Sequence, residues 1–483
     1  MTTTPIATMR ERFAALLSPD RVIDHPLERR LYSRDGSIAM GDAGLVVLPE
    51  TTAEVVDCVR LAGELGVPVV PRGSGTGLCG GAVPLDGAIV LSVARMTRIL
   101  DVDPAVPSAR VEPGVLNLDL SVAVRHLGLH YAPDPSSQQA CSIGGNVATN
   151  AGGPHCLASG VTAQHVLGME IVLADGEVLR LGGPAPDPPG YDLRGFVVGG
   201  EGTLGVVTEV TVRLMRTPRH VRTMLLDFTS VRAAGQAVGD IIGGGVIPAA
   251  MEMMDQRMTV AVEAFVQCDL PVDAAAMLLV EVDGTEAEVA AHTAVVERVG
   301  AETGARRVRV ARDAAEAALF WKARKSAFGA VARVAPNYYL HDCVVPRTRL
   351  VEILERIYEI GDAFDLVIMN VFHAGDGNLH PLILYDGREP GAHDRAEVLS
   401  AEILRLCIRL GGSITGEHGV GLEKRAFLGE MYAETDLACM RAVRQAMDPH
   451  GVANPGKKLA PAGVTAAAHG LHPLERAGVI SRA

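Results

Sequence analysis

The strongest constraint on the fold is a glycine-rich stretch, PRGSGTGLCGGAVP, at residues 71–84. It directly follows an apolar run, VPVV, that is typical of a short buried strand. Its glycines match the spacing G-x-G-x-x-G of a dinucleotide fingerprint, but that fingerprint requires the third glycine to open a helix. Pro84 and Gly87 follow too closely for a long helix. The stretch therefore predicts a loop whose backbone N–H groups bind an anion, the alternative being an ordinary glycine-rich loop.

The neighbouring segments predict a mixture of helices and strands. A strand at 45–48 (LVVL) precedes a helix that the capping sequence TTAE opens and Gly66 ends. The stretch YAPDPSSQQACSIGGNVATNAGG (131–153) has no amphipathic period, so we expect a long irregular segment with a function. An Asp-Gly hairpin is predicted over 169–183, and a glycine turn followed by a β-branched strand over 199–214.

Length, charge and cysteine usage narrow the class of protein. The 483 residues predict two or three domains, and a formal charge of −13 disfavours nucleic acid as a partner. Eight cysteines occur without CxxC spacing, so we expect no iron–sulfur centre in this chain and a reducing, cytoplasmic location. No apolar stretch reaches the roughly 18 residues that span a membrane, and the N-terminus does not resemble a secretory signal.

Two histidines flank an Asp-Gly pair in FHAGDGNLHPLI, residues 372–383. If Asp376 and Gly377 are the centre of a hairpin turn, His373 and His380 lie directly opposite each other on one face of the sheet. Such a pair provides two ligands of a metal site. The alternative is that both histidines hydrogen-bond the substrate.

A third ligand and a base are available in GGSITGEHGVGLEKR, residues 411–425. His373, His380 and Glu417 would form a set of two histidines and one carboxylate with open positions. That pattern is typical of a catalytic divalent metal, with zinc as the first guess. His418, the next residue, has the chemistry of a general base pointed at the same cleft.

An arginine occurs in the predicted helix DAAEAALFWKARKSAF, residues 313–328. Helical spacing would place Trp321, Arg324 and Phe328 on one face. Arg324 could then bind a carboxylate in a cleft through paired hydrogen bonds, the alternative being a solvated surface arginine.

The motifs PRGSGTGLCGGAVP, APDPSSQQACSIGGNVATNAGGPHCLASG and GGEGTLGVVTEVTVRL together resemble the FAD-binding domain of the vanillyl-alcohol oxidase/p-cresol methylhydroxylase superfamily. The resemblance implies an α+β fold in which two small subdomains hold an extended FAD, with an α+β cap for the substrate and a C-terminal segment returning to the flavin. The FAD-binding residues that it implies are Arg72, Gly73, Ser74, Gly75, Thr76, Gly77, Pro133, Asp134, Pro135, Ser136, Ser142, Ile143, Gly144, Gly145, Thr149, Gly153, Gly202, Gly205, Val207, Asn454 and Lys457. Thr76 stands where flavin-linked relatives often carry a histidine, so we expect non-covalent FAD.

The motifs FHAGDGNLHPLI, GGSITGEHGVGLEKR and DPHGVANPGKKL resemble the C-terminal half of FAD-dependent D-2-hydroxyacid dehydrogenases. The resemblance implies that Arg324 binds the substrate carboxylate, that His373, His380 and Glu417 hold the metal, and that His418 is the base. The domains that it implies are 1–219 for FAD, 220–420 for the cap, 421–463 for the closing segment and 464–483 for a tail. Leu382 replaces an asparagine of relatives that act on 2-hydroxyglutarate, which favours a smaller or more apolar substrate.

The reaction implied by this resemblance is oxidation of glycolate, or of another small D-2-hydroxy acid, to the 2-oxo acid. A hydride passes to flavin N5, and the electrons pass to an acceptor other than NAD. Implied partners are an iron–sulfur electron-transfer subunit and a second FAD-domain subunit, with the chain docked at the inner face of the membrane. Two alternatives stay open: a D-lactate dehydrogenase of the same fold, and a non-catalytic, FAD-carrying assembly subunit.

Overall fold

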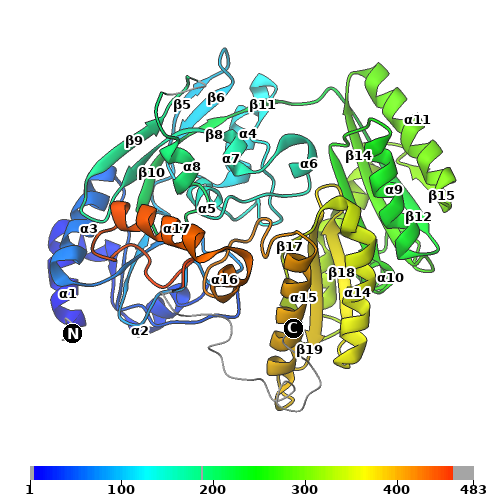
Figure 1. Ribbon diagram of the computed structural model, residues 1–483. Coiled ribbons are helices and arrows are strands. Elements are labelled where there is room, and N and C mark those ends of the chain that lie inside the picture. Colours follow the sequence, from blue (N-terminus) through cyan, green and yellow to red (C-terminus); the bar gives the residue numbers. More distant parts are fainter. Residues whose placement is uncertain (1–4, 186–188, 461–483) are drawn as a thin grey trace. The chain divides into compact units, whose positions relative to one another are not determined.

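The computed structural model describes residues 5–185 and 189–460. These residues form two compact units, whose helices and strands are labelled in Figure 1. The first unit contains the described parts of 1–152, 160–217 and 417–469, and the second contains 153–159 and 218–416. The tail expected at 464–483 lies outside the described residues.

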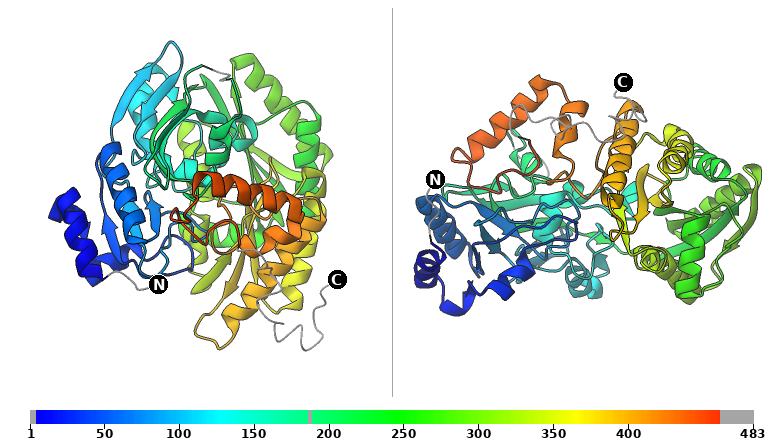
Figure 2. Two further views of the ribbon diagram at one scale, coloured as in Figure 1. Left: turned by 60° about the vertical axis from the view of Figure 1, so that its left-hand side comes forward. Right: turned by 90° about the horizontal axis from the view of Figure 1, so that it is seen from below.

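The first unit begins with a four-stranded sheet of order β1-β2-β4-β3. Its strands are β1 (Val22–Ile23), β2 (Leu45–Val47), β4 (Ile89–Ser92) and β3 (Val69–Arg72). β2, β4 and β3 are parallel, and α3 (Thr52–Leu65) connects β2 to β3 as predicted. The Thr51 side chain caps α3, and Gly66 ends it with φ +64°. α1 (Ile6–Leu16) packs beside α3 in a shared apolar core (Figure 2).

A five-stranded antiparallel sheet of order β5-β6-β10-β8-β9 completes the core of the first unit. Its strands are β5 (Ile99–Asp103), β6 (Ser108–Val111), β10 (Val206–Arg213), β8 (Val166–Val172) and β9 (Val178–Gly182). The predicted hairpin over 169–183 and the predicted strand within 199–214 are therefore confirmed. The remaining elements of this unit include α2 (Pro26–Arg29), α4 (Asn117–Val124), β7 (Leu129–His130), α7 (Thr162–His165), α8 (Leu193–Val197), β11 (Met215–Arg216), α16 (Leu428–Met431) and α17 (Glu434–Met447).

The sequence predicted that the segment 131–153 is irregular throughout, but the structure shows a helix within it. The helix is α5 (Ile143–Thr149), which the Ser142 side chain caps by accepting a hydrogen bond from the Gly145 N–H. Ile143 and Val147 are buried four residues apart, on one helical face. A seven-residue helix with two glycines is too short to show an amphipathic period, which is why the sequence analysis missed it.

The second unit is built on an eight-stranded sheet, in which β17 pairs with β19 beside the path β15-β12-β14-β13-β18-β19-β16. Its strands are β12 (His220–Phe228), β13 (Ala250–Asp255), β14 (Ala276–Gly284), β15 (Ala305–Val310), β16 (Asn337–Leu340), β17 (Cys343–Val344), β18 (Ile368–His373) and β19 (Asn378–Tyr385). Its helices are α6 (Cys156–Ser159), α9 (Val231–Gly243), α10 (Gln256–Val266), α11 (Glu286–Glu302), α12 (Ala314–Lys325), α13 (Ala327–Val331), α14 (Leu350–Ala363) and α15 (Ala392–Arg409).

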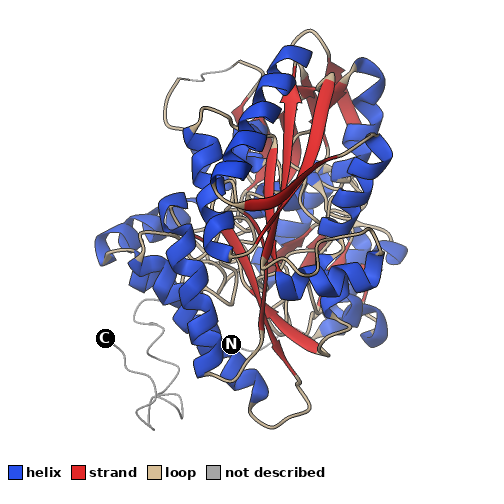
Figure 3. Ribbon diagram, turned by 90° about the vertical axis from the view of Figure 1, so that its right-hand side faces the viewer, coloured by secondary structure: helices blue, strands red, loops and turns tan. Residues whose placement is uncertain are grey.

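Helices cover both faces of this sheet (Figure 3). α9, α11, α14 and α15 lie across one face (Figure 1), and α10, α12 and α13 pack on the other. The helix predicted over 313–328 is interrupted at Ser326, so Phe328 belongs to α13 and does not share one helical face with Trp321 and Arg324. Among the described residues, no helix has both the length and the apolar character needed to span a bilayer.

Candidate functional site

His373 and His380 lie on one face of their hairpin, but they are not directly opposite each other. β18 pairs with β19 so that His373 is opposite Asn378 and His380 is opposite Val371. The predicted register was wrong because the connecting loop has four residues, 374–377, instead of a two-residue Asp-Gly turn. Residues 378 and 380 are two apart on β19, so both histidines still face the same side of the sheet. Their ring centroids are 5.1 Å apart and the rings are nearly perpendicular.

A buried glutamate on the neighbouring strand binds both His373 and Arg324. Glu252 of β13 is opposite His373 in the sheet, and His373 Nδ1 donates to Glu252 Oε1 at 2.7 Å. Glu252 Oε2 forms an ion pair with Arg324 Nη2 at 2.5 Å. Burial acts to raise the pKa of Glu252, but the charges of Arg324 and His373 outweigh it and hold that pKa below its ordinary value. The carboxylate therefore stays ionised and fixes the orientation of both partners.

Arg324 is the residue predicted to bind a substrate carboxylate. It is buried, with 3% of its surface exposed, and its Nε has no hydrogen-bond partner among the described residues. A solvated surface arginine is thereby excluded. One edge of the guanidinium is held by Glu252, so the binding of a substrate carboxylate rests on the remaining N–H groups and stays a prediction.

Glu252 was missed by the sequence analysis. The sequence signal that could have identified it is a carboxylate inside the apolar strand AMEMMD (250–255), because an ionised side chain in a buried strand requires charged partners.

His380 is fixed through its Nδ1, which lies 3.0 Å from the backbone oxygen of His341. A carbonyl can only accept, so Nδ1 carries the proton and Nε2 the lone pair.

Asp342, the residue after His341, is fully buried. Its carboxylate accepts hydrogen bonds from Thr415 Oγ1 at 2.5 Å and from the Gly416 N–H at 3.0 Å. These contacts fix the backbone directly before Glu417.

Four side chains form a group with the chemistry of a metal site. Each offers one ligand atom, and these atoms all lie within 4.8 Å of one another: Asp342, His380, Glu417 and His418. The group contains two of the three predicted ligands and the predicted base. His373 is not a member of the group found among the described residues, and Asp342 was not predicted.

The donor set fits a divalent cation. His373 and His380 both use Nδ1 to donate to protein oxygens, which directs the lone pair to Nε2, the usual arrangement of a metal-ligating histidine. Carboxylates from Asp342 and Glu417 supply negative charge beside His380. The residues therefore suit a metal such as zinc, while its identity and the membership of His373 stay predictions.

The glycine-rich loop after β3 has the properties of an anion cradle. No backbone N–H of residues 74–77 donates to another described residue, and Gly75 adopts φ +71°. The loop is held from the side by Gly36, whose N–H donates to the Gly77 oxygen, and by Arg72, whose Nη1 donates to the Arg34 oxygen at 2.7 Å. The next regular element is β4, so the rejection of the helix-opening fingerprint is confirmed. Arg72 binds backbone here, and its contact with a pyrophosphate stays a prediction.

The start of α5 packs closely against two neighbours, the glycine loop and Pro113. A Cβ on Gly73 would lie 2.3 Å from Ser142 Oγ, and one on Gly144 would lie 2.6 Å from the Pro113 Cβ. Neither position therefore has room for a side chain, and the Gly73 contact keeps the glycine loop against Ser142, the residue that caps α5.

The C-terminal segment binds the backbone of the glycine-rich stretch 71–84 and of the 199–205 loop. Asn454 Nδ2 donates to the Gly81 oxygen at 2.9 Å and to the Glu201 oxygen at 2.7 Å. Lys457 is fully buried and its Nζ donates to the Val83 oxygen. Burial lowers the pKa of Lys457 to about 8, so its ammonium is still charged at neutral pH and would gain from a bound anion.

The other predicted FAD-binding residues lie within the first unit, except Gly153, which begins the 153–159 segment of the second. They are Pro133, Asp134, Pro135, Ser136, Ile143, Gly145, Thr149, Gly202, Gly205 and Val207. Unpaired N–H groups in the glycine loop, close glycine packing and a buried ammonium together fit a cofactor with phosphates such as FAD. Contacts of individual residues with FAD stay predictions.

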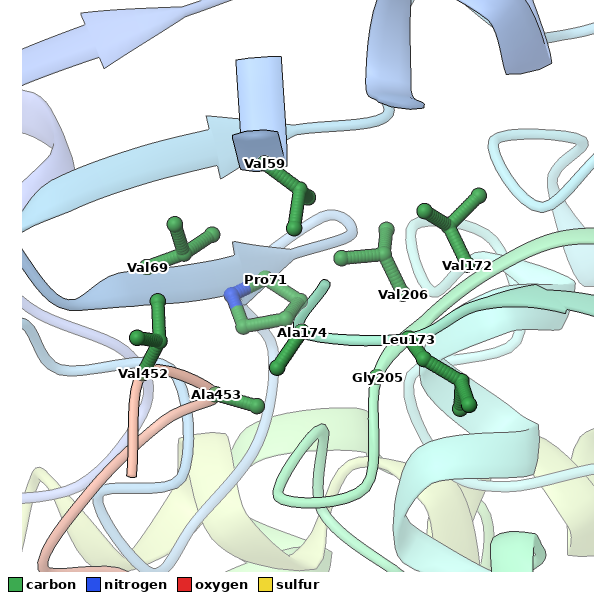
Figure 4. A pocket seen from close by; sticks show the side chains of 10 residues that line it. All are labelled: Val59, Val69, Pro71, Val172, Leu173, Ala174, Gly205, Val206, Val452 and Ala453. Carbon is green, nitrogen blue, oxygen red and sulfur yellow. The ribbon is translucent and has the colours of Figure 1, made fainter. Parts of the chain in front are cut away.

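The first unit also contains a small apolar cavity (Figure 4). It is lined by Val59, Val69, Pro71, Val172, Leu173, Ala174, Gly205, Val206, Val452 and Ala453. Figure 4 shows Val59, Val69 and Val206 pointing into it. With no polar side chain in its lining, we interpret it as a gap in core packing rather than a site for a polar ligand.

Gly73→Ala is expected to lower the FAD content of the purified protein strongly, because the new Cβ would push the loop away from Ser142. Gly63→Ala is the matched control, since a Cβ in α3 at that position meets nothing within 4 Å. That control should keep its FAD and gain about 0.5–1 kcal/mol of stability. FAD absorbance per protein measures the outcome, and equal flavin content in the two variants would contradict the packing argument.

Comparison with known proteins agrees with this geometry. Residues 43–182 match the family model "FAD binding domain", and residues 217–458 match "FAD linked oxidases, C-terminal domain". The fold resembles the crystal structure of p-cresol methylhydroxylase with substrate bound, with a TM-score of 0.80 at 18% identity over 95% of this chain and 98% of that one. The predicted fold class is thereby confirmed.

Two curated relatives cover most of the chain. Glycolate oxidase subunit GlcD of Escherichia coli K12 is 50% identical over 86% of this chain and 83% of its own length. A D-lactate dehydrogenase of Anaerostipes hadrus is 31% identical over 93% of this chain and 96% of its own length.

Proposed function

Because this chain belongs to the FAD-linked oxidase family, we propose that it oxidises glycolate, or another small D-2-hydroxy acid, to the 2-oxo acid. The observation that carries the proposal is the grouping of His380, Glu417 and His418, with His373 on the same sheet face. A 2-hydroxy acid needs a cation for its carboxylate and a base for its hydroxyl, and Arg324 and His418 have these chemistries.

The side chains have separate roles in this proposal. Arg324, oriented by Glu252, binds the substrate carboxylate and so fixes the position of Cα. His418 removes the hydroxyl proton. A divalent metal on His373, His380 and Glu417 would supply a Lewis acid that lowers the pKa of the hydroxyl. FAD, held without a covalent bond through the 73–77 loop, would accept the hydride from Cα.

The apolar surroundings of the histidines favour a small substrate. Leu382 lies on the same face of β19 as His380, is fully buried, and belongs to an apolar cluster with Met254 and Met369. This position offers no polar group to the distal carboxylate of a dicarboxylic acid. Glycolate and D-lactate both lack a distal carboxylate. One of the two relatives is named a glycolate oxidase subunit, and the other is named a D-lactate dehydrogenase.

In this proposal, the reduced flavin passes its electrons to a partner subunit. The E. coli relative is named a subunit, and no cysteine of this chain lies in a CxxC spacing. An iron–sulfur subunit, with a second FAD-domain subunit, would then accept the electrons at the inner face of the membrane. Turnover with oxygen alone as fast as with a quinone or dye would contradict this arrangement.

An anaerobic substrate panel tests the proposed reaction. The FAD-loaded chain is mixed with glycolate, D-lactate, L-lactate and 2-hydroxyglutarate, and flavin bleaching is recorded. We expect bleaching by glycolate or D-lactate and little by 2-hydroxyglutarate. If none of the four bleaches the flavin, the dehydrogenase proposal is wrong and the assembly-subunit alternative is favoured.

A further inference from the structure

Glu201 is an unusual residue in the loop between α8 and β10. It has φ +54°, in the left-handed region that residues with a Cβ rarely adopt, although it stands between glycines at 200 and 202. It is also buried, with 5% of its surface exposed. A strained backbone and a buried carboxylate at one position indicate that the side chain has a specific task.

The carboxylate of Glu201 binds the backbone that directly follows the Glu417–His418 pair. Oε1 accepts a hydrogen bond from the Val420 N–H at 2.8 Å, and Oε2 accepts one from the Gly421 N–H at 2.7 Å. Gly419 lies so close that an added Cβ would be 3.0 Å from Glu201 Oε1. Lys458 Nζ lies 3.7 Å from Oε1 and compensates the buried charge.

The backbone of Glu201 is fixed as well. Its carbonyl oxygen accepts a hydrogen bond from Asn454 Nδ2, and its N–H donates to the Ala148 oxygen of α5. One residue therefore connects α5, the 199–205 loop, the C-terminal segment and the 419–421 backbone, all within the first unit.

The backbone directly before the Glu417–His418 pair is bound by a second carboxylate. Within the second unit, Asp342 accepts hydrogen bonds from Thr415 and from the Gly416 N–H. Each flank of the Glu417–His418 pair is thus bound by a carboxylate, residues 415–416 by Asp342 and residues 420–421 by Glu201. Since each peptide group is planar, binding the 420–421 backbone within the first unit restricts the positions that the His418 side chain, two residues before Val420, can reach.

We propose that Glu201 is a positioning residue for the proposed dehydrogenase reaction, which fixes His418 by binding the Val420 and Gly421 N–H groups. The inference rests on the proposed role of His418 as the base. Glutamate suits the task because two carboxylate oxygens can accept from two successive N–H groups. A glutamine would present an N–H₂ group to one of them, and the two donors would repel.

Glu201→Gln tests the proposal, with Glu170→Gln as the matched control. Glu170 is a similarly buried carboxylate of the first unit that accepts hydrogen bonds from Thr52, Thr208 and Arg180, away from this loop. Two quantities are measured on the FAD-loaded proteins: amide hydrogen exchange in peptides covering 417–424, and the rate of flavin reduction at saturating 2-hydroxy acid.

In Glu201→Gln we expect faster exchange in 417–424 and reduction slowed by about 10- to 100-fold, with the substrate affinity retained. Glu170→Gln should match the parent chain in both quantities. Unchanged exchange, unchanged reduction, or equal slowing in the two variants would overturn the proposal. Should Glu201→Gln fail to fold, Glu201→Asp, whose shorter side chain cannot reach both N–H groups, is judged by the same criteria. A parent chain that no 2-hydroxy acid reduces would refute the proposed function instead, and the exchange data would still decide whether the contact exists.

Discussion

His418→Ala is expected to slow flavin reduction by 2-hydroxy acids by about 10²- to 10⁴-fold, the usual contribution of a general base. The FAD should remain bound, because His418 is not among the residues that shape the glycine loop or the start of α5. Rapid mixing under anaerobic conditions measures the rate through the loss of flavin absorbance.

His126→Ala is the control for this variant. His126 is an exposed histidine of the first unit whose Nδ1 lies near the Ala123 oxygen. In the His126→Ala variant, 2-hydroxy acids should reduce the flavin at the same rate as in the parent chain. Undiminished reduction in His418→Ala would remove His418 from the role of base.

Glu252→Gln is expected to destabilise the second unit by about 3–5 kcal/mol, the usual effect of removing one partner from a buried ion pair. The substitution leaves the buried Arg324 guanidinium without its counter-charge and His373 without its anionic acceptor. Urea unfolding followed by tryptophan fluorescence measures the change. Trp321 is the single tryptophan of the chain and lies in α12 beside Arg324, so its emission reports on this unit.

Glu302→Gln is the matched control for Glu252→Gln. It removes the same charge from an exposed ion pair with Arg298 on α11, where the loss should be below about 1 kcal/mol. If both variants lose the same stability, the pair of Glu252 with Arg324 does not contribute as a buried ion pair.

The local features of the fold could be predicted from the sequence. Thr51 and Gly66 delimit α3 because capping depends on adjacent residues. The prediction that His373 and His380 face one side was correct, because the four-residue loop is longer than the predicted two-residue turn by an even number of residues and strands alternate with a period of two. Their register could not be predicted, because it depends on whether the Asp-Gly pair forms the whole turn or part of a four-residue loop.

Local sequence patterns could not identify the carboxylates that bind the residues of the candidate site. Glu252, Asp342 and Glu201 come from three separate segments, and each binds a residue at least 70 positions away. Their spacing in the sequence has no period that a helix or strand would impose. α5 was missed for a different reason, since a seven-residue helix that contains two glycines is too short to show an amphipathic period.

One measurement tests the account most directly: the rate of anaerobic flavin bleaching by the preferred 2-hydroxy acid, before and after removal of bound metal with a chelator. We predict rapid bleaching in the metal-loaded protein, loss of most of that rate on chelation without loss of FAD, and recovery when a divalent cation is restored. Bleaching at the same rate in the chelated, metal-free protein would contradict the assignment of His380 and Glu417 as ligands of a catalytic metal.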